Sequence, residues 1–258
     1  MTETKLTGRT VLITGASAGI GEACARAVAA RGARLVLAAR RAARLEEQAD
    51  KLRGAGTQVL ALELDVSDAG AVDETLGGLP AEWCEIDVLV NNAGLGRGLD
   101  KLWNGDPVDW DEMIDTNVKG LLYVTGAVVP GMVERGRGHV INLGSVAGHE
   151  VYPGGAVYCA TKHAVGAIPR GLRMDVLGTG VRVSTVDPGM VETEFSVVRF
   201  HGDRERAGRV YRGMDPLTPD DIAETVVWVA TRPPHVCIDE IIIKPTDQAS
   251  ATMVHRKD

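Results

Sequence analysis

Seven short apolar runs that alternate with helical patterns constrain the fold more than any other feature of the sequence. The runs are rich in β-branched residues and apolar on both faces, as expected of strands buried between two helix layers. They cover residues 10–14, 35–39, 58–64, 88–90, 139–143, 181–186 and 238–243, and helical patterns cover 19–31, 41–53, 69–77, 109–134, 156–177 and 219–231. This alternation predicts an α/β fold with a doubly wound parallel sheet of about seven strands and helices on both faces.

A single domain, residues 1–258, accounts for the whole chain. Its length lies at the upper end of what one α/β domain usually occupies, and no internal repeat or low-complexity linker divides it. Residues 192–216 interrupt the alternation and are rich in Arg and Gly, which predicts a lid or substrate loop. Residues 245–258 follow the last predicted strand as a C-terminal tail.

Composition and charge exclude several functional classes. The net charge of −7 leaves no surplus of Lys and Arg to neutralise phosphates, so nucleic acid is not expected as the main partner. No export signal is expected, because residues 1–10 lack an apolar stretch. No membrane partner is expected either, because the longest uncharged stretch, 120–133, is too short to span a bilayer. The cysteines form no C-x-x-C pair, which favours a reduced cytoplasmic protein without a metal site; they are Cys24, Cys84, Cys159 and Cys237.

A glycine-rich turn follows the first predicted strand and begins an Ala-rich helix. Small residues there allow the backbone to approach a pyrophosphate, whose charge the helix N-terminus stabilises. A turn of this kind also occurs without a ligand, but its place between strand and helix favours a Rossmann-type dinucleotide site. The residues expected to contact the cofactor are Gly15, Ser17, Ala18, Gly19, Ile20 and Gly21.

The end of the second predicted strand indicates which dinucleotide binds. A site that prefers NAD places a carboxylate there to hold the ribose diol. This chain instead has Arg40 and Arg41, two guanidinium groups that suit a 2′-phosphate. A pair of solvated arginines at a helix start is the alternative, and we predict NADP(H) as the cofactor.

Two further strand ends fit a nucleotide lying across the sheet. Asp65 and Val66 close the third strand, where a carboxylate can accept a hydrogen bond from the adenine amine. The fourth strand ends in Asn92, Ala93 and Gly94, whose small side chains allow close backbone contact. Capped turns are the alternative interpretation of both segments.

Three residue types suited to proton transfer converge near the end of the fifth strand. Tyr158 and Lys162 are four residues apart on a predicted helix, so their side chains share a face, and Ser145 ends the preceding strand. A free phenol titrates near ~10, and a neighbouring ammonium stabilises its phenolate. The serine hydroxyl would orient the reacting oxygen, so the three residues suit hydride transfer coupled to proton transfer.

Taken together, these motifs resemble the short-chain dehydrogenase/reductase family over the whole chain. The matching segments are residues 14–21, 91–94, 158–162 and 187–193, with Asn117 and Ser145. The resemblance implies that Ser145, Tyr158 and Lys162 are catalytic, with Tyr158 as the acid/base, and that Asn117 holds a water linking Lys162 to solvent. It also implies contacts to the nicotinamide end from Pro188, Gly189, Val191 and Thr193.

Four segments and the C-terminal tail are similar to the bacterial NADP-dependent 3-hydroxy acid dehydrogenases, also called serine or allo-threonine dehydrogenases. The segments cover residues 79–95, 113–125, 192–203 and 232–246. This likeness implies a homotetramer that interconverts a small anionic 3-hydroxy acid, such as serine, allo-threonine or 3-hydroxypropionate, and its keto or semialdehyde form. One alternative is an NADPH-dependent reductase of another small aldehyde or ketone, such as a sulfonated aldehyde or a natural-product intermediate. A non-catalytic nucleotide sensor is a further alternative, which the intact proton-transfer set disfavours.

A carboxylate substrate would need a cation near the reacting carbon. The candidates are Arg199, Arg256, His149 and Lys244, and Arg199 is singled out because it lies in the predicted substrate loop. Pro169 lies about two turns beyond Lys162 and is expected to kink the helix that carries it.

Overall fold

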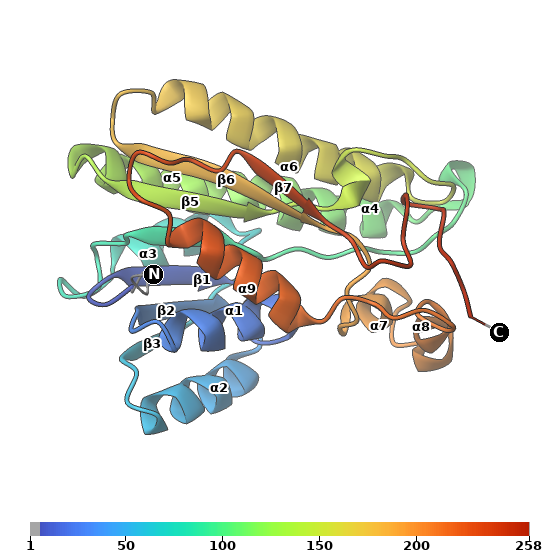
Figure 1. Ribbon diagram of the computed structural model, residues 1–258, viewed down its shortest axis with the longest axis horizontal. Helices are drawn as coiled ribbons and strands as arrows, with labels where there is room; N and C mark the ends of the chain where they lie inside the picture. Colours follow the sequence, from blue (N-terminus) through green and yellow to red (C-terminus); the bar gives the residue numbers. More distant parts are fainter. Residues whose placement is uncertain (1–5, 258) are drawn as a thin grey trace.

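A parallel sheet of seven strands runs through the centre of the computed structural model, which describes residues 6–257 (Figure 1). The described residues exclude 1–5 and Asp258. Residues 1–5 are half of the segment in which no export signal is expected, and Asp258 ends the predicted tail. The strand order is β3-β2-β1-β4-β5-β6-β7, so the chain changes direction across the sheet between β1 and β4. In a parallel sheet this switch point opens a crevice at the carboxyl ends of the strands.

The strands match the predicted apolar runs closely. They are β1 Thr10–Thr14, β2 Arg34–Ala39, β3 Val59–Glu63, β4 Val88–Asn91, β5 Gly138–Leu143, β6 Val181–Pro188 and β7 Glu240–Ile243. Successive residues of β1 point to opposite faces: Val11 and Ile13 join one core cluster and Leu12 the other. Both faces of the central strands are therefore buried, which explains why their sequences are apolar without alternation.

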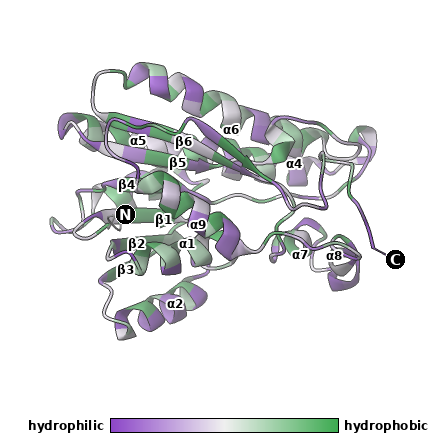
Figure 2. Cartoon of the chain, viewed as in Figure 1, coloured by the Kyte–Doolittle hydropathy of each residue, from purple (hydrophilic) through white to green (hydrophobic). Residues whose placement is uncertain are grey.

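Helices cover both faces of the sheet. On one face α1 (Gly19–Ala29), α2 (Ala42–Gly54) and α9 (Pro219–Ala230) share one core cluster with the strands. On the other lie α3 (Ala69–Gly77), α5 (Leu121–Glu134) and α6 (Ala156–Asp175). Figure 2 shows hydrophobic residues along the strands and polar residues on the outer helical surfaces. The fold is thus the predicted single, doubly wound α/β domain of Rossmann type.

One predicted helix is divided in the structure. The expected helix 109–134 consists of α4 (Pro107–Ile114), a π-helical turn (Asp115–Gly120) and α5. Gly120 lies against Val66, and a Cβ at Gly120 would lie 2.7 Å from Val66 Cγ2. The prediction of one regular α-helix over these residues was therefore wrong. The π-helical turn was missed because one extra residue in a turn leaves the apolar pattern of the sequence unchanged.

Segment 192–216 and the tail lie together beyond the carboxyl ends of the strands (Figure 1). The segment contains two short helices, α7 (Phe195–Arg199) and α8 (Arg204–Arg209). A bridge between Val191 and Leu217 joins its two ends.

The α6 helix continues past Pro169 to Asp175 without interruption.

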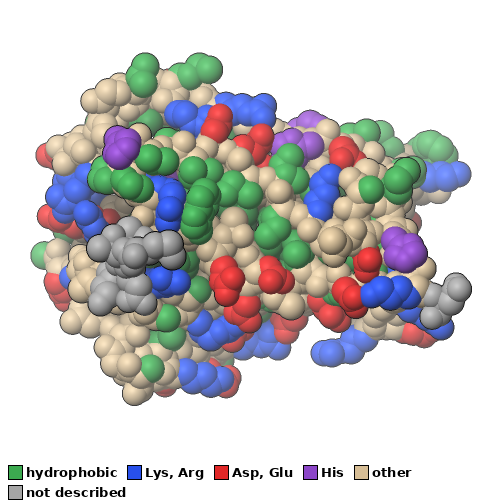
Figure 3. Space-filling model, viewed as in Figure 1, with side chains coloured by type: hydrophobic (Ala, Val, Ile, Leu, Met, Phe, Trp, Pro, Cys, Tyr) green, Lys and Arg blue, Asp and Glu red, His purple; other side chains and the backbone are tan. Residues whose placement is uncertain are grey.

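The described residues contain no helix that could span a bilayer, and the face drawn in Figure 3 carries charges of both signs. Within residues 6–257 no helix combines the length and the apolarity needed to cross a membrane. Acidic and basic side chains both occur across the face shown in Figure 3.

Candidate active site

A cavity of about 720 Å³ lies at the carboxyl edge of the sheet. Its walls come from the residues that follow β1 to β6, from the start of α6, from segment 192–216 and from the tail. This size lies within the range of small-molecule and cofactor sites. Of the residues predicted from sequence to bind a cofactor, all line the cavity except Gly21.

The turn between β1 and α1 is shaped by Asn92. The Asn92 side-chain amide donates hydrogen bonds to the carbonyls of Thr14 at 2.9 Å and of Gly15 at 3.2 Å. Gly15 has a φ of +64°, and a Cβ there would lie 2.9 Å from Asn92 Nδ2. Gly21 lies behind the turn, where a Cβ would be 2.4 Å from the Gly15 carbonyl oxygen, so Gly21 allows the turn to be tight.

The two predicted phosphate-binding arginines line the cavity but also contact acids. Arg40 lies 3.6 Å from Asp65, and Arg41 donates to Glu194 at 2.8 Å and to Ser17 Oγ at 3.2 Å. Hydrogen bonds from the arginines lower the pKa of the Glu194 carboxyl. Sequence reasoning missed Glu194 because it lies about 150 residues away along the chain.

Arg44 is a third arginine near these two; it does not line the cavity but pairs with Glu194 at 2.7 Å. It was also missed, although its place in the first turn of α2, beside Arg40 and Arg41, was a signal for it. The start of α2 and segment 192–216 are therefore joined through one carboxylate.

The ends of β3 and β4 contribute as expected. Asp65 accepts hydrogen bonds from the Ser67 backbone at 3.0 Å and hydroxyl at 2.7 Å, so it closes a turn and also lines the cavity. Burial alone would raise the pKa of Asp65, but the bonds from Ser67 and the charge of Arg40 lower it. Val66, Ala93 and Gly94 line the same wall.

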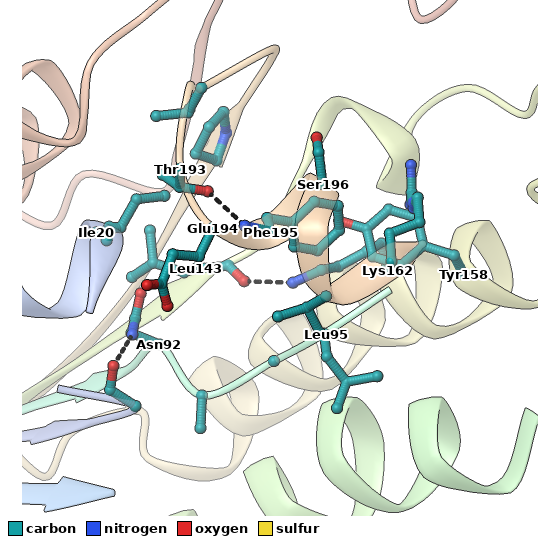
Figure 4. Close-up of a pocket in the computed structure, with 18 of the residues that line it drawn as sticks. Ile20, Asn92, Leu95, Leu143, Tyr158, Lys162, Thr193, Glu194, Phe195 and Ser196 are labelled. Carbon is teal, nitrogen blue, oxygen red and sulfur yellow. Dashed lines mark hydrogen bonds between the residues drawn. The ribbon is translucent and has the colours of Figure 1, made fainter. Parts of the chain in front are cut away.

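Tyr158 and Lys162 lie side by side on α6 and face the cavity (Figure 4). Lys162 Nζ donates to the Leu143 carbonyl at 2.9 Å. Burial raises the pKa of Tyr158 to about 12, while the charge of Arg199 and a hydrogen bond with the Ser145 side chain oppose that rise. Burial lowers the pKa of Lys162 to about 8, opposed by the charge of Asp187. At neutral pH the ammonium form of Lys162 still predominates.

Ser145 is held at the end of β5 by a carboxylate that sequence reasoning did not assign. Its backbone N–H donates to Asp187 Oδ1 at 3.0 Å, and its hydroxyl accepts from the Ala147 N–H at 3.1 Å. Asp187 Oδ2 lies 3.0 Å from His149 Nε2, and burial raises the pKa of the Asp187 carboxyl. A Cβ at Gly144 would lie 1.7 Å from Asp187 Oδ1, so only glycine leaves room for this arrangement.

Asn117 lies in the π-helical turn and is buried. Its side-chain oxygen accepts from the Leu95 N–H at 2.8 Å, and its amide donates to the Leu95 carbonyl at 2.8 Å and to Thr161 Oγ1 at 3.0 Å. A Cβ at Gly94 would lie 3.1 Å from Asn117 Oδ1 and 3.7 Å from Lys162 Nζ, so both residues lie beside Gly94. Both amide hydrogens of Asn117 therefore already have protein partners.

The C-terminal tail contacts the predicted nicotinamide end of the cavity. Pro188, Gly189, Val191 and Thr193 line the cavity. Gln248 of the tail accepts a hydrogen bond from the Met190 N–H at 2.8 Å. Thr193 Oγ1 accepts from the N–H of Phe195, the first residue of α7, at 3.1 Å (Figure 4).

Comparisons with known proteins show the family of this chain. Residues 9–203 match the family model described as short chain dehydrogenase. One relative is the NADP-dependent 3-hydroxy acid dehydrogenase YdfG of Salmonella typhi, to which the chain is 50% identical over 248 residues. The match covers 95% of this chain and 99% of that protein. It is 46% identical over 255 residues, 98% of each chain, to the NADP-dependent 3-hydroxy acid dehydrogenase of Schizosaccharomyces pombe.

A solved structure of serine dehydrogenase, in its closed form complexed with NADP+, is similar with a TM-score of 0.90 and 48% identity, covering 96% of this chain and 100% of that one. Fold, motifs and near full-length likeness all point the same way. This chain belongs to the short-chain dehydrogenase family.

Proposed function

We propose that the protein is an NADP(H)-dependent 3-hydroxy acid dehydrogenase, which interconverts a small 3-hydroxy acid and its keto or semialdehyde form. The observation that carries this proposal is the buried Tyr158–Lys162 pair, which faces the same cavity as the dinucleotide turn and the arginines after β2. Relatives that are 46% and 50% identical over nearly the full length have this activity in their names.

The cavity fits a 2′-phosphorylated dinucleotide. Gly15 and Gly94 line the cavity, the N-terminus of α1 would face the phosphates, and Arg40 and Arg41 supply cations on the same wall. NADP+, when bound, accepts the hydride from the substrate's carbinol carbon. Pro188, Gly189, Val191 and Thr193 would hold its nicotinamide end.

The residues of this chain would move the proton. In the oxidation direction Tyr158, as phenolate, takes the proton of the substrate hydroxyl, and in reduction the phenol returns it. The Lys162 ammonium stabilises the phenolate, which the buried phenol alone would form only at high pH. The Ser145 hydroxyl, held in place through Asp187, orients the substrate oxygen. Asn117 fixes the Leu95 backbone beside Lys162, so a water link to solvent would have to use other atoms than its amide hydrogens.

The test is Tyr158→Phe, assayed by NADPH absorbance with 3-hydroxypropionate and L-serine. We expect kcat/KM to fall by about 10²–10⁴-fold, the usual contribution of a positioned acid/base. The dissociation constant for NADPH, measured by fluorescence, should change less than about threefold because the phenol oxygen is not part of the phosphate site. Turnover within a few-fold of the wild type would exclude Tyr158 as the acid/base.

We extend the proposal to a lid over the cavity, a homotetrameric assembly and a cytoplasmic location. Segment 192–216 and the tail 245–258 would form a lid, supported by the cavity-lining residues that both contribute. A homotetramer is supported by exposed apolar side chains such as Trp103, Met174 and Leu177, and light scattering would give the mass. A cytoplasmic location is supported by four cysteines that form no disulfide in the described residues.

A further inference from the structure

Arg199, the last residue of α7, lies beside the phenol of Tyr158. Its guanidinium carbon is 4.7 Å from the centroid of the Tyr158 ring and 4.8 Å from that of Phe195. One terminal nitrogen donates to the Tyr152 hydroxyl at 3.1 Å. The Nε atom is shielded from solvent and contacts no acceptor in the described part of the chain. The cation is thus fixed against aromatic rings with donor capacity left over (Figure 4 shows Phe195 and Tyr158).

The backbone opposite makes room for this guanidinium. A Cβ at Gly96 would lie 2.8 Å from a terminal nitrogen of Arg199 and 2.9 Å from its Nε. The Gly98 N–H donates to the Arg199 carbonyl at 2.9 Å, which fixes the end of α7 against the same segment. The position of the guanidinium is therefore defined from both sides.

Arg199 differs from the other arginines that line the cavity, because it has no ion pair among residues 6–257. Each of the others contacts a carboxylate: Arg40 lies 3.6 Å from Asp65, Arg41 lies 2.8 Å from Glu194, and Arg97 lies 2.7 Å from Glu112. Holding a partly buried cation without a counter-charge costs free energy. An anion bound from solution would offset that cost.

The remaining cations considered for a substrate carboxylate are engaged elsewhere. His149 contacts Asp187, Lys244 Nζ donates to the Ala249 carbonyl at 2.9 Å, and Arg256 donates to the Val210 carbonyl at 3.0 Å. None of the three lines the cavity.

We propose that Arg199 is the specificity-determining residue of this enzyme, and that it binds the substrate's carboxylate while Tyr158 contacts the reacting hydroxyl. This inference rests on the proposed function and adds to it the group that selects the substrate. Because the guanidinium carbon lies 4.7 Å from the centroid of the Tyr158 ring, a short spacer of one or two carbons between carboxylate and carbinol suits the site. Planar, bidentate recognition of a carboxylate is the geometry that guanidinium favours.

The experiment compares Arg199→Met with the wild type on two matched substrates, 3-hydroxypropionate and its methyl ester. We expect the ratio of kcat/KM for the acid to kcat/KM for the ester to fall by about 10²–10³-fold, chiefly through KM for the acid, since a charge-assisted contact is lost. Arg199→Lys should retain part of the ratio. Propionate, tested as a competitive inhibitor of ester oxidation, should bind the Arg199→Met variant at least tenfold more weakly.

Arg206→Met is the matched control, because Arg206 also lies in segment 192–216 and stacks on an aromatic ring, that of Phe200, but does not line the cavity. It should leave the ratio unchanged. A parallel loss of acid and ester oxidation in Arg199→Met would overturn the inference and show that Arg199 only supports Tyr158. A wild type that oxidises neither substrate with NADP+ would refute the proposed function instead. Hydroxyethanesulfonate as a third substrate separates selection of carboxylates from selection of any small anion: preference for the sulfonate would overturn the carboxylate assignment.

Discussion

A buried histidine in β5 makes the stability of this protein depend on pH in a way that can be calculated. His139 is 1% exposed, and its Nε2 lies 2.8 Å from Ser184 Oγ. The single Ser184 hydroxyl hydrogen is donated to the Ile238 carbonyl at 2.5 Å, so His139 Nε2 must be the donor to Ser184. Its Nδ1 then carries no hydrogen and has no partner in the described residues.

Burial, with a smaller contribution from the charge of Arg182, lowers the pKa of His139 to about 3. The unfolded chain binds a proton at this residue below its ordinary pKa of about 6.5. Above pH 6.5 the imidazole is neutral in both the folded and the unfolded chain, so the free energy of unfolding is at its full value. As pH falls from 6.5 toward 3, only the unfolded chain binds the proton, and the free energy of unfolding decreases. The loss is about 1.4 kcal/mol per pH unit, or about 2 kcal/mol of unfolding free energy between pH 6.5 and 5.

The assay is urea unfolding, followed by circular dichroism at a fixed protein concentration, of the wild type and His139→Gln at pH 7.5, 6 and 5. Glutamine keeps a donor toward Ser184 but does not titrate, so other groups cancel in the comparison. The wild type's advantage over the variant should shrink by about 2 kcal/mol between pH 7.5 and 5. His235→Gln, at an exposed histidine, controls for loss of an imidazole from the surface. A constant difference across this range would refute the reasoning.

Two further predictions concern the site. Gly144→Ala should lower kcat by about tenfold or more and the free energy of unfolding by about 1–3 kcal/mol. The reason is that the alanine Cβ would displace the Asp187 carboxylate, which holds the Ser145 N–H. Steady-state kinetics measure the first effect and urea unfolding the second. Replacing Arg40 and Arg41 together with Ala should raise KM for NADPH by about 10²-fold and KM for NADH only a few-fold, since two charge-assisted contacts to a 2′-phosphate are lost.

Each has a control and a contrary outcome. Gly77→Ala, at the exposed end of α3 where a Cβ would meet nothing within 4 Å, should be neutral or stabilising. Gly144→Ala with full activity would show that the Asp187 contact does not position Ser145. Equal rises in KM for both nucleotides would show that the arginines do not distinguish the 2′-phosphate.

The sequence by itself determined the architecture and the place of the site. Burial of a parallel sheet on both faces requires continuous apolar runs, which are visible locally, so all seven strands were predicted to within a few residues. The carboxyl ends of such strands meet at one edge, which brought the turn at Gly15, the arginines after β2 and the residues around Ser145 and Tyr158 to one cavity.

Only the tertiary structure decided which groups pair inside that cavity. The contacts of Glu194 with Arg41, of Asp187 with the Ser145 N–H, and of the Arg199 guanidinium with aromatic rings join residues far apart in the chain. The π-helical turn around Asn117 was hidden as well, because it leaves the apolar pattern intact. Charge and hydrogen bonding depend on distances of a few ångströms set by packing, and a local pattern of residue types carries no information about them.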